Sequence, residues 1–234
     1  MDAPEPRMIA TWQAPLEGGK TTDELLVSFD QGRKRRVLIL PALFDEANKL
    51  RRFTIQMMRS CDESGVDSFL PDLPGCNESL ASLEKQTLES WRNVALNAAQ
   101  AFRATHVLAI RGGALLAPET LPGWHYAPLT GAKLLRAMVR AQTIAAKEAG
   151  REVSSEALME QGRQSGLQLA GWNLGAEMLR QLESAVPPAS DNQTLIEQKD
   201  LGGRGLWLRA EPDEDQGLSE ALAKIASGQA GDAQ

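Results

Sequence analysis

The residues with the clearest chemical meaning lie at the end of an apolar segment in the middle of the chain. In the sequence AIRGGALLA, from Ala109 to Ala117, a short predicted strand ends, the turn Arg111-Gly112-Gly113 follows, and a helix-forming segment begins directly after it. A side chain held on such a tight turn stands clear of the backbone and can meet a ligand. The Arg111 guanidinium stays protonated and only donates hydrogen bonds, so it is neither a nucleophile nor a general base.

Few other side chains offer nucleophilic or metal chemistry. The histidines are His106 and His125, and the cysteines are Cys61 and Cys76. They lack the spacing of metal ligands, so we expect no metal and no cofactor. We expect His106 to be structural, and we favour packing of His125 beside its aromatic neighbours in the sequence over a catalytic role. Cys76 follows a strand candidate, but no base is placed beside it, which makes it a weak candidate nucleophile.

The elements around this turn alternate between short apolar runs and longer helical stretches. This order predicts an α/β fold, with a mostly parallel sheet and helices on both of its faces. We predict strands at 36–40, 66–70, 105–110, 194–198 and 205–209, and helices at 46–61, 83–103, 134–147, 154–164 and 218–225, with a further helix starting within 172–182. Because parallel strands present their carboxyl ends at one edge, the turn at Arg111 and the loop after 66–70 should share that edge.

The composition indicates one domain over residues 1–234, since 42% of the residues are apolar and 24% are charged. We expect residues 118–190 to form a cap or lid within it, and residues 228–234 to be a frayed tail. No apolar run approaches the roughly 20 residues of a membrane span. The net charge of −6 argues against nucleic acid as a partner. Two cysteines and a polar start favour a cytoplasmic location.

The segment around Arg111 also resembles a known motif. Ala109 and Gly113 are the small residues that the α/β-hydrolase nucleophile elbow, G-x-S-x-G, has on either side of its serine. This segment resembles the exosortase A system-associated hydrolases, most closely the second type, whose elbow reads GLRLGALLA. Three further segments carry the same resemblance: LPALFDEANKLRR, PDLPGCNES and WHYAPLTGAKLL. The resemblance covers roughly Leu38 to Leu182. This sequence departs from the family's elbow at Ala109, which replaces a glycine, and at Gly112, which replaces a leucine. It implies an α/β-hydrolase-like sheet and a role in bacterial exopolysaccharide loci.

The resemblance does not bring a complete catalytic triad with it. In this fold the triad occurs in the order Ser, Asp or Glu, then His after a late strand, and no histidine follows His125. We therefore expect a protein without serine-hydrolase catalysis that binds an anionic ligand or a partner. Two alternatives stay open: an esterase, thioesterase or acyltransferase with a relocated nucleophile, and a non-catalytic scaffold.

The candidate ligand is an acidic glycan, a phosphorylated lipid carrier or an acyl compound, the first two suggested by the resemblance. The residues predicted to contact it are Asn48, Arg51, Arg52, Asp72, Arg111 and His125. A static ion pair is the competing interpretation of Arg111, with Asp45, Glu46, Asp72 or Glu119 as its partner. The sequence leaves open whether the chain forms homo-oligomers.

Overall fold

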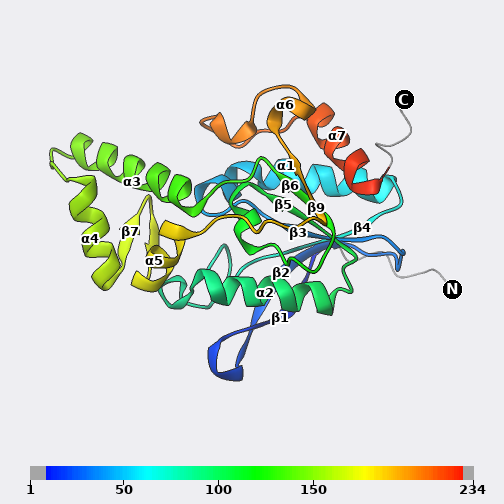
Figure 1. The fold of residues 1–234 in the computed structure, drawn as a ribbon, viewed down its shortest axis with the longest axis horizontal. Helices are drawn as coiled ribbons and strands as arrows, with labels where there is room; N and C mark the ends of the chain where they lie inside the picture. Colours follow the sequence, from blue (N-terminus) through cyan, green and yellow to red (C-terminus); the bar gives the residue numbers. More distant parts are fainter. Residues whose placement is uncertain (1–8, 229–234) are drawn as a thin grey trace.

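A seven-stranded, mostly parallel sheet forms the centre of the computed structural model, which describes residues 9–228 (Figure 1). The strand order is β1-β2-β4-β3-β5-β6-β9. The strands are β1 (Ile9–Pro15), β2 (Thr21–Phe29), β3 (Arg36–Leu40), β4 (Asp67–Pro71), β5 (His106–Ile110), β6 (Gly123–Tyr126) and β9 (Gln193–Ile196). The last five run parallel, whereas β1 and β2 extend the sheet as an antiparallel hairpin.

Helices cover both faces of this sheet. The α-helices are α1 (Asp45–Glu63), α2 (Leu88–Ala101), α3 (Gly131–Glu148), α4 (Ser155–Ser165), α5 (Ala176–Ser184), α6 (Gln198–Leu201) and α7 (Gln216–Ser227). Short 3-10 helices are η1 (Glu17–Gly19), η2 (Leu83–Lys85), η3 (Arg111–Leu116) and η4 (Leu206–Leu208). In Figure 1, α1 and α7 lie on one face and α2 on the other, each over its own apolar cluster. The predicted α/β class with helices on both faces is therefore confirmed.

The central strands are buried on both faces, which explains their composition. In β3, Val37, Leu38, Ile39 and Leu40 are all fully buried, as a strand between two helical layers requires. Such a strand reads as an unbroken apolar run, so its bounds agree with those predicted from the sequence. Pro41 follows at the carboxyl edge, where its missing N–H costs no ladder hydrogen bond.

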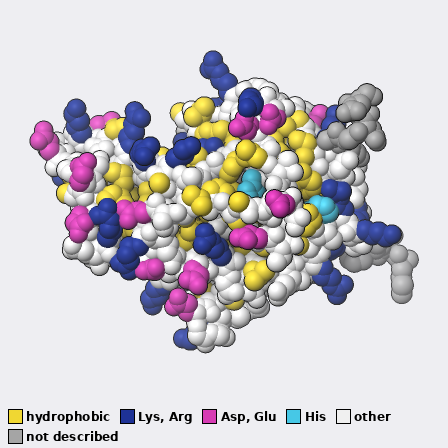
Figure 2. All heavy atoms as spheres, viewed as in Figure 1, with side chains coloured by type: hydrophobic (Ala, Val, Ile, Leu, Met, Phe, Trp, Pro, Cys, Tyr) yellow, Lys and Arg dark blue, Asp and Glu magenta, His cyan; other side chains and the backbone are white. Residues whose placement is uncertain are grey.

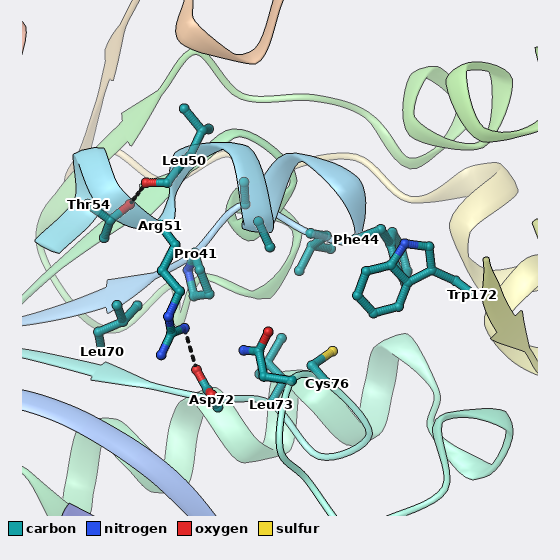
Figure 3. Close-up of a pocket in the computed structure, with 14 residues that line it drawn as sticks. Pro41, Phe44, Leu50, Arg51, Thr54, Leu70, Asp72, Leu73, Cys76 and Trp172 are labelled. Carbon is teal, nitrogen blue, oxygen red and sulfur yellow. Dashed lines mark hydrogen bonds and ion pairs between the residues drawn. The ribbon is translucent and has the colours of Figure 1, made fainter. Parts of the chain in front are cut away.

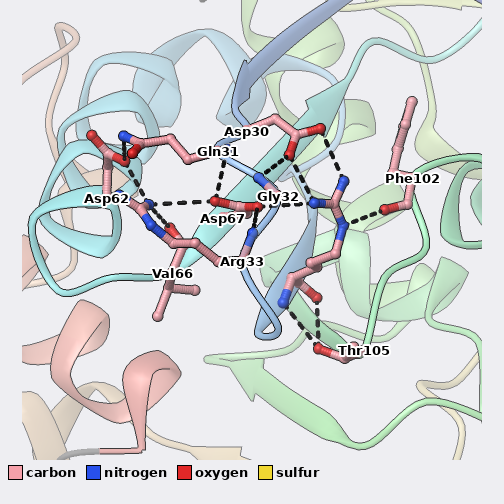
Figure 4. Close-up of polar contacts among 10 residues, drawn as sticks. Asp30, Gln31, Gly32, Arg33, Asp62, Val66, Asp67, Phe102 and Thr105 are labelled. Carbon is pink, nitrogen blue, oxygen red and sulfur yellow. Dashed lines mark hydrogen bonds and ion pairs between the residues drawn. The ribbon is translucent and has the colours of Figure 1, made fainter. Parts of the chain in front are cut away.

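An ionic network fixes the opposite, amino-terminal edge of the sheet (Figure 4). The fully buried Asp67 carboxylate accepts hydrogen bonds from the backbone N–H groups of Gln31 and Arg33, at 3.1 and 2.8 Å, and from Arg36 Nη1 at 2.9 Å. Arg36 also binds Asp30 and donates to the Phe102 carbonyl oxygen. The network ties the loop between β2 and β3 to β4, far from the carboxyl ends of the strands.

Residues 131–184, called the α3–α5 lobe below, are inserted between the neighbouring strands β6 and β9. The lobe holds α3, α4, α5 and a two-stranded sheet of β7 (Leu167–Leu169) and β8 (Trp172–Leu174). In Figure 1 it projects to the left of the sheet. It lies within the segment 118–190 that the sequence predicted as an insertion, and Trp172 packs edge-on against Phe44 of the loop after β3, with ring centres 5.6 Å apart.

Several predicted elements were wrong or incomplete. The hairpin β1–β2 and strand β6 were missed, because short or half-exposed strands alternate too little to stand out. The predicted strand 205–209 is the 3-10 helix η4, and the predicted helix within 172–182 begins only at Ala176, after β8. The predicted helix 83–103 is divided into η2 and α2. Residues 229–234 of the predicted tail lie outside the described residues.

Within the described range 9–228, the helices are too short or too polar to cross a lipid bilayer.

Candidate functional site

The turn after β5 is strained and closely packed. Arg111 has φ +54°, a left-handed conformation that a bulky side chain adopts only at some cost in free energy. A Cβ atom at Gly113 would lie 2.3 Å from the Pro41 carbonyl oxygen and 2.5 Å from that of Leu40, so only glycine fits there. The chain continues as η3, a 3-10 helix of six residues, in place of the longer helix that the sequence suggested. The close contact of Gly113 with the end of β3 thus fixes the backbone position of the turn from which the Arg111 side chain extends.

The Arg111 side chain is buried, and each of its three nitrogens donates a hydrogen bond. Its Nε and Nη2 donate to the two carboxylate oxygens of Glu46, each at 3.0 Å, and its Nη1 donates to the Ala127 carbonyl oxygen at 2.8 Å. The ring of Trp207 covers the guanidinium, with the ring centre 3.9 Å from Cζ. Such two-pronged pairing is among the strongest interactions available to an arginine. The guanidinium therefore has its charge neutralised and one face covered.

The static ion pair is thus the arrangement that the structure contains, and Glu46 is the acid that forms it. The other three acids predicted as partners lie elsewhere: Asp45 binds Lys49 on the surface, Asp72 binds Arg51, and Glu119 is exposed. Glu46 occupies the first turn of α1, where the helix dipole favours a carboxylate. The amino-terminal end of α1 therefore stabilises the negative charge of Glu46, which pairs with Arg111.

The other predicted ligand residues do not gather around Arg111. Arg52 pairs with Glu214 on the surface, and its side chain is 64% exposed. Asn48 is exposed on α1. Adjacent arginines on a helix point about 100° apart, which explains why Arg51 and Arg52 reach different partners. Of the predicted set, only Arg51 and Asp72 come together in a pocket.

That pocket lies between the loop after β3, the start of α1 and the loop after β4 (Figure 3). Arg51 Nη1 donates to Asp72 Oδ1 at 2.8 Å, and the Arg51 side chain is 30% exposed. Asp72 is buried, and its second oxygen, Oδ2, has no hydrogen-bond partner among the described residues. Trp172 from the lobe forms part of the wall, and the remaining lining is mostly apolar. The enclosed space is about 20 Å³, which is room for about one water molecule.

Two buried acids give this region a negative character. Glu24 of β2 is 1% exposed and receives a hydrogen bond from Ser79 Oγ, while its Oε2 has no partner in the described part of the chain. Burial raises the pKa of Glu24, and the Asp72 charge adds to that rise. Burial, with the charges of Asp72 and Glu24, also raises the pKa of the Cys76 thiol to about 12. Cys76 is therefore a neutral thiol at physiological pH.

The two histidines lie in neighbouring strands of the sheet. His106 begins β5 and stacks on Trp124 with ring centres 5.5 Å apart, and burial lowers its pKa. His125 is buried in β6, in register with Ala109, and burial lowers its pKa as well. Alternation along β6 turns His125 to the face opposite Trp124 and Tyr126, so the predicted packing beside those rings was wrong. Both imidazole rings are therefore mainly neutral at physiological pH.

Two tryptophans that the sequence did not single out as site residues line or cover parts of this region. Trp207 covers Arg111 and packs edge-on against Tyr126, with ring centres 5.9 Å apart. Trp172 closes the pocket of Arg51 and Asp72. Neither position has a local sequence signal, because each tryptophan reaches its partner from a segment far away in the chain.

The comparisons with known proteins agree on the fold. No protein-family model matches the chain, and a sequence search of curated proteins finds no match. Among solved structures, Est1E from Butyrivibrio proteoclasticus with bound ferulic acid has a TM-score of 0.57 at 13% identity, covering 93% of this chain and 97% of its own.

Two further structures of similar length give the same result. A putative hydrolase from Agrobacterium vitis S4 has a TM-score of 0.52 at 13% identity, covering 95% of this chain and 99% of its own. The esterase domain of a Rhodothermus marinus protein has a TM-score of 0.52 at 9% identity, covering 95% of this chain and 97% of its own. With the mostly parallel sheet and the strand–turn–helix at Arg111, these likenesses show that the chain has the α/β-hydrolase fold.

Proposed function

We propose that this chain is a non-hydrolytic protein of the α/β-hydrolase fold, which binds a small acidic ligand in the pocket of Arg51 and Asp72. The observation that carries the proposal is the state of Arg111. This residue follows β5 at the turn where the fold's hydrolases have their nucleophile. Here that position holds a cation whose three nitrogens all donate to Glu46 or Ala127 and whose face is covered by Trp207.

The missing base supports the same conclusion independently. A serine-type hydrolase needs a histidine to accept the proton of the nucleophile, and in this fold it follows a late strand. Both histidines of this chain precede Tyr126 in the sequence. A relocated cysteine nucleophile has no support either, because the raised pKa of Cys76 leaves almost no thiolate at neutral pH. The esterase alternative therefore has no support from Arg111, from Cys76 or from the positions of the two histidines.

The ligand pocket is placed at Arg51 because that arginine keeps donors to spare. Among the described residues only its Nη1 has a hydrogen-bond partner, and the side chain is partly open to solvent. Beside it, Asp72 Oδ2 is a buried acceptor without a donor, which is unfavourable until one arrives. A ligand that both accepts and donates hydrogen bonds satisfies the two residues together. A bare anion satisfies only Arg51 and is repelled by Asp72.

This requirement narrows the ligand classes predicted from the sequence. An acidic sugar carries a carboxylate for Arg51 and hydroxyl donors for Asp72, whereas a polyprenyl phosphate offers mainly acceptors. The resemblance to the exosortase A system-associated hydrolases supports an acidic glycan from exopolysaccharide synthesis as this sugar. Because the pocket has only about 20 Å³ of room, this proposal requires the pocket wall, which includes Trp172, to move aside before a sugar can enter.

Ligand binding tests the proposal with neighbouring variants. We expect glucuronic acid to bind the purified chain in titration calorimetry, and Arg51→Gln to weaken binding at least ~10-fold because a charge-assisted hydrogen bond is lost. Arg52→Gln is the matched control, with the same charge change one residue along α1, and should bind like the parent. Equal binding by all three proteins would reject the pocket.

Catalysis is tested separately. The parent chain should hydrolyse no ester or thioester above the blank rate and should not react with a serine-directed fluorophosphonate probe. A labelled side chain whose replacement abolishes turnover would establish the hydrolase alternative in place of the proposal.

A further inference from the structure

The exposed side of α3 carries a line of basic residues that the proposed ligand site does not use. Lys133, Arg136, Arg140 and Lys147 follow one another at spacings of three, four and seven residues. Residues at these spacings lie on one face of an α-helix. All four are exposed, and the helix contains a single acid, Glu148 at its end. These four residues are called the α3 basic stripe.

The α3 basic stripe is not neutralised by the chain itself. None of its members forms an ion pair within residues 9–228, although ten of the chain's other arginines and lysines across that range do. Figure 2 shows Lys and Arg side chains in a row along the part of the molecule where Figure 1 draws α3. In a chain with a net charge of −6, four unneutralised cations in a line make a local positive field on an otherwise acidic molecule.

Apolar groups accompany these charges. Ile144 lies between Arg140 and Lys147, four residues after the one and three before the other, and is 49% exposed. Val153, just beyond the end of α3, is 38% exposed. Exposed aliphatic side chains beside basic ones are the composition of surfaces that lie at a lipid interface. A purely ionic contact would gain nothing from Ile144.

A groove runs beside the stripe, between α3 and α4. Arg136 and Arg140 lie at its rim, and its lining also includes Leu135, Val139 and Met159. Its volume is about 440 Å³, and Glu183 is the acid in its lining. Glu183 is already paired with Arg163, which leaves the two rim arginines available. The groove thus offers an apolar surface directly beside two cations, an arrangement that suits a phospholipid with its acyl chain and anionic headgroup.

We propose that the α3 basic stripe docks the chain onto an anionic phospholipid bilayer, with Ile144 inserted at the interface. A bilayer fits better than a nucleic acid, because α3 has no aromatic side chain on which a base could stack. The acidic remainder of the molecule is repelled from the same surface and orients the stripe towards it. The inference is independent of the ligand pocket and of whether the chain is catalytic.

Vesicle co-sedimentation of the full chain tests this docking. We expect binding to phosphatidylglycerol-containing vesicles at low salt, no binding to pure phosphatidylcholine vesicles, and release as salt is raised. The double variant Arg136→Glu/Arg140→Glu should lower the partition coefficient more than ~10-fold, since each basic residue contributes about fivefold. Lys20→Glu/Lys224→Glu has the same charge change on exposed positions of other elements and should partition like the parent.

A third variant separates a bilayer from a soluble polyanion. Ile144→Ser leaves the charge unchanged and should weaken vesicle binding severalfold, whereas binding to heparin or duplex DNA would not depend on it. The proposal is overturned if the parent does not bind anionic vesicles at low salt, or if the Arg136/Arg140 variant binds as the parent does. Binding to heparin or DNA without binding to vesicles would likewise overturn it, since the stripe would then serve a soluble polyanion.

Discussion

Glu46 and Arg111 are joined by two parallel hydrogen bonds, each 3.0 Å long, between the first turn of α1 and the turn after β5. The pair joins the segments that follow the adjacent strands β3 and β5 at their carboxyl ends. Both side chains are largely shielded from water, at 18% and 10% exposed. The ion pair therefore holds together the same edge at which hydrolases of this fold carry out catalysis.

Breaking this pair should destabilise the fold. In Glu46→Gln, Arg111 keeps its buried charge but loses the carboxylate that compensates it, so the free energy of unfolding should fall by about 2–4 kcal/mol. Urea denaturation measures the change. Asp45→Asn, which removes a carboxylate that is 61% exposed and paired with Lys49, is the control and should cost less than about 1 kcal/mol. Similar losses in both variants would contradict the role given to Glu46.

Restoring a serine at the turn should not restore hydrolysis. Arg111→Ser provides a hydroxyl on the strained turn, but no histidine stands ready to take its proton. We expect p-nitrophenyl acetate and butyrate hydrolysis to stay at the blank rate from pH 6 to 9. Saturable turnover in this variant would reveal a base that the geometry does not suggest.

Glycine at position 113 should be essential, and glycine at 112 should not. The added Cβ of Gly113→Ala would lie 2.3 Å from a backbone oxygen of Pro41 that cannot move without shifting β3, so we expect a loss of about 3 kcal/mol or more. In Gly112→Ala the nearest atom is 3.2 Å away and belongs to the flexible Leu43 side chain, so the loss should stay below about 1.5 kcal/mol. Thermal melts of the two variants check the contrast, and a reversed order would refute it.

The amino-terminal network should make stability depend on pH in the acid range. Hydrogen bonding to Arg36 lowers the pKa of Asp30 from 3.8 to about 2. A carboxylate with a lowered folded-state pKa contributes its full stability above its unfolded pKa and loses it as pH falls through the folded value. Because the Asp30 side chain is 44% exposed, solvent screening limits this contribution to about 1 kcal/mol or less.

The comparison of parent and Asp30→Asn in urea isolates this contribution. The parent should be the more stable at pH 6, and the gap should close between about pH 4 and pH 2. A gap that stays constant over that interval would mean that Asp30 acts through its shape and not its charge.

The sequence alone determined much of the architecture. The apolar run 37–40, which is short and followed by Pro41, indicates a strand buried on both faces, and the periodic apolar positions of α1 indicate a helix face that packs on a core. The α/β class therefore followed from local patterns. The same reasoning placed Arg111 on a tight turn, because glycines follow a strand there. The sequence also shows directly that no histidine follows His125, where the catalytic histidine of this fold would be expected.

Tertiary structure decided what these residues do. Four acids were equal candidates for Arg111, and only the packing of α1 against the turn selected Glu46. The segment 205–209 has the composition of a strand, yet it forms η4 and places Trp207 over Arg111. Arg51 and Arg52 are alike in sequence, but the helix turns one towards Asp72 and the other towards the surface. Contacts between residues far apart in the sequence depend on how the helices and strands pack against one another. Local sequence patterns do not determine that packing.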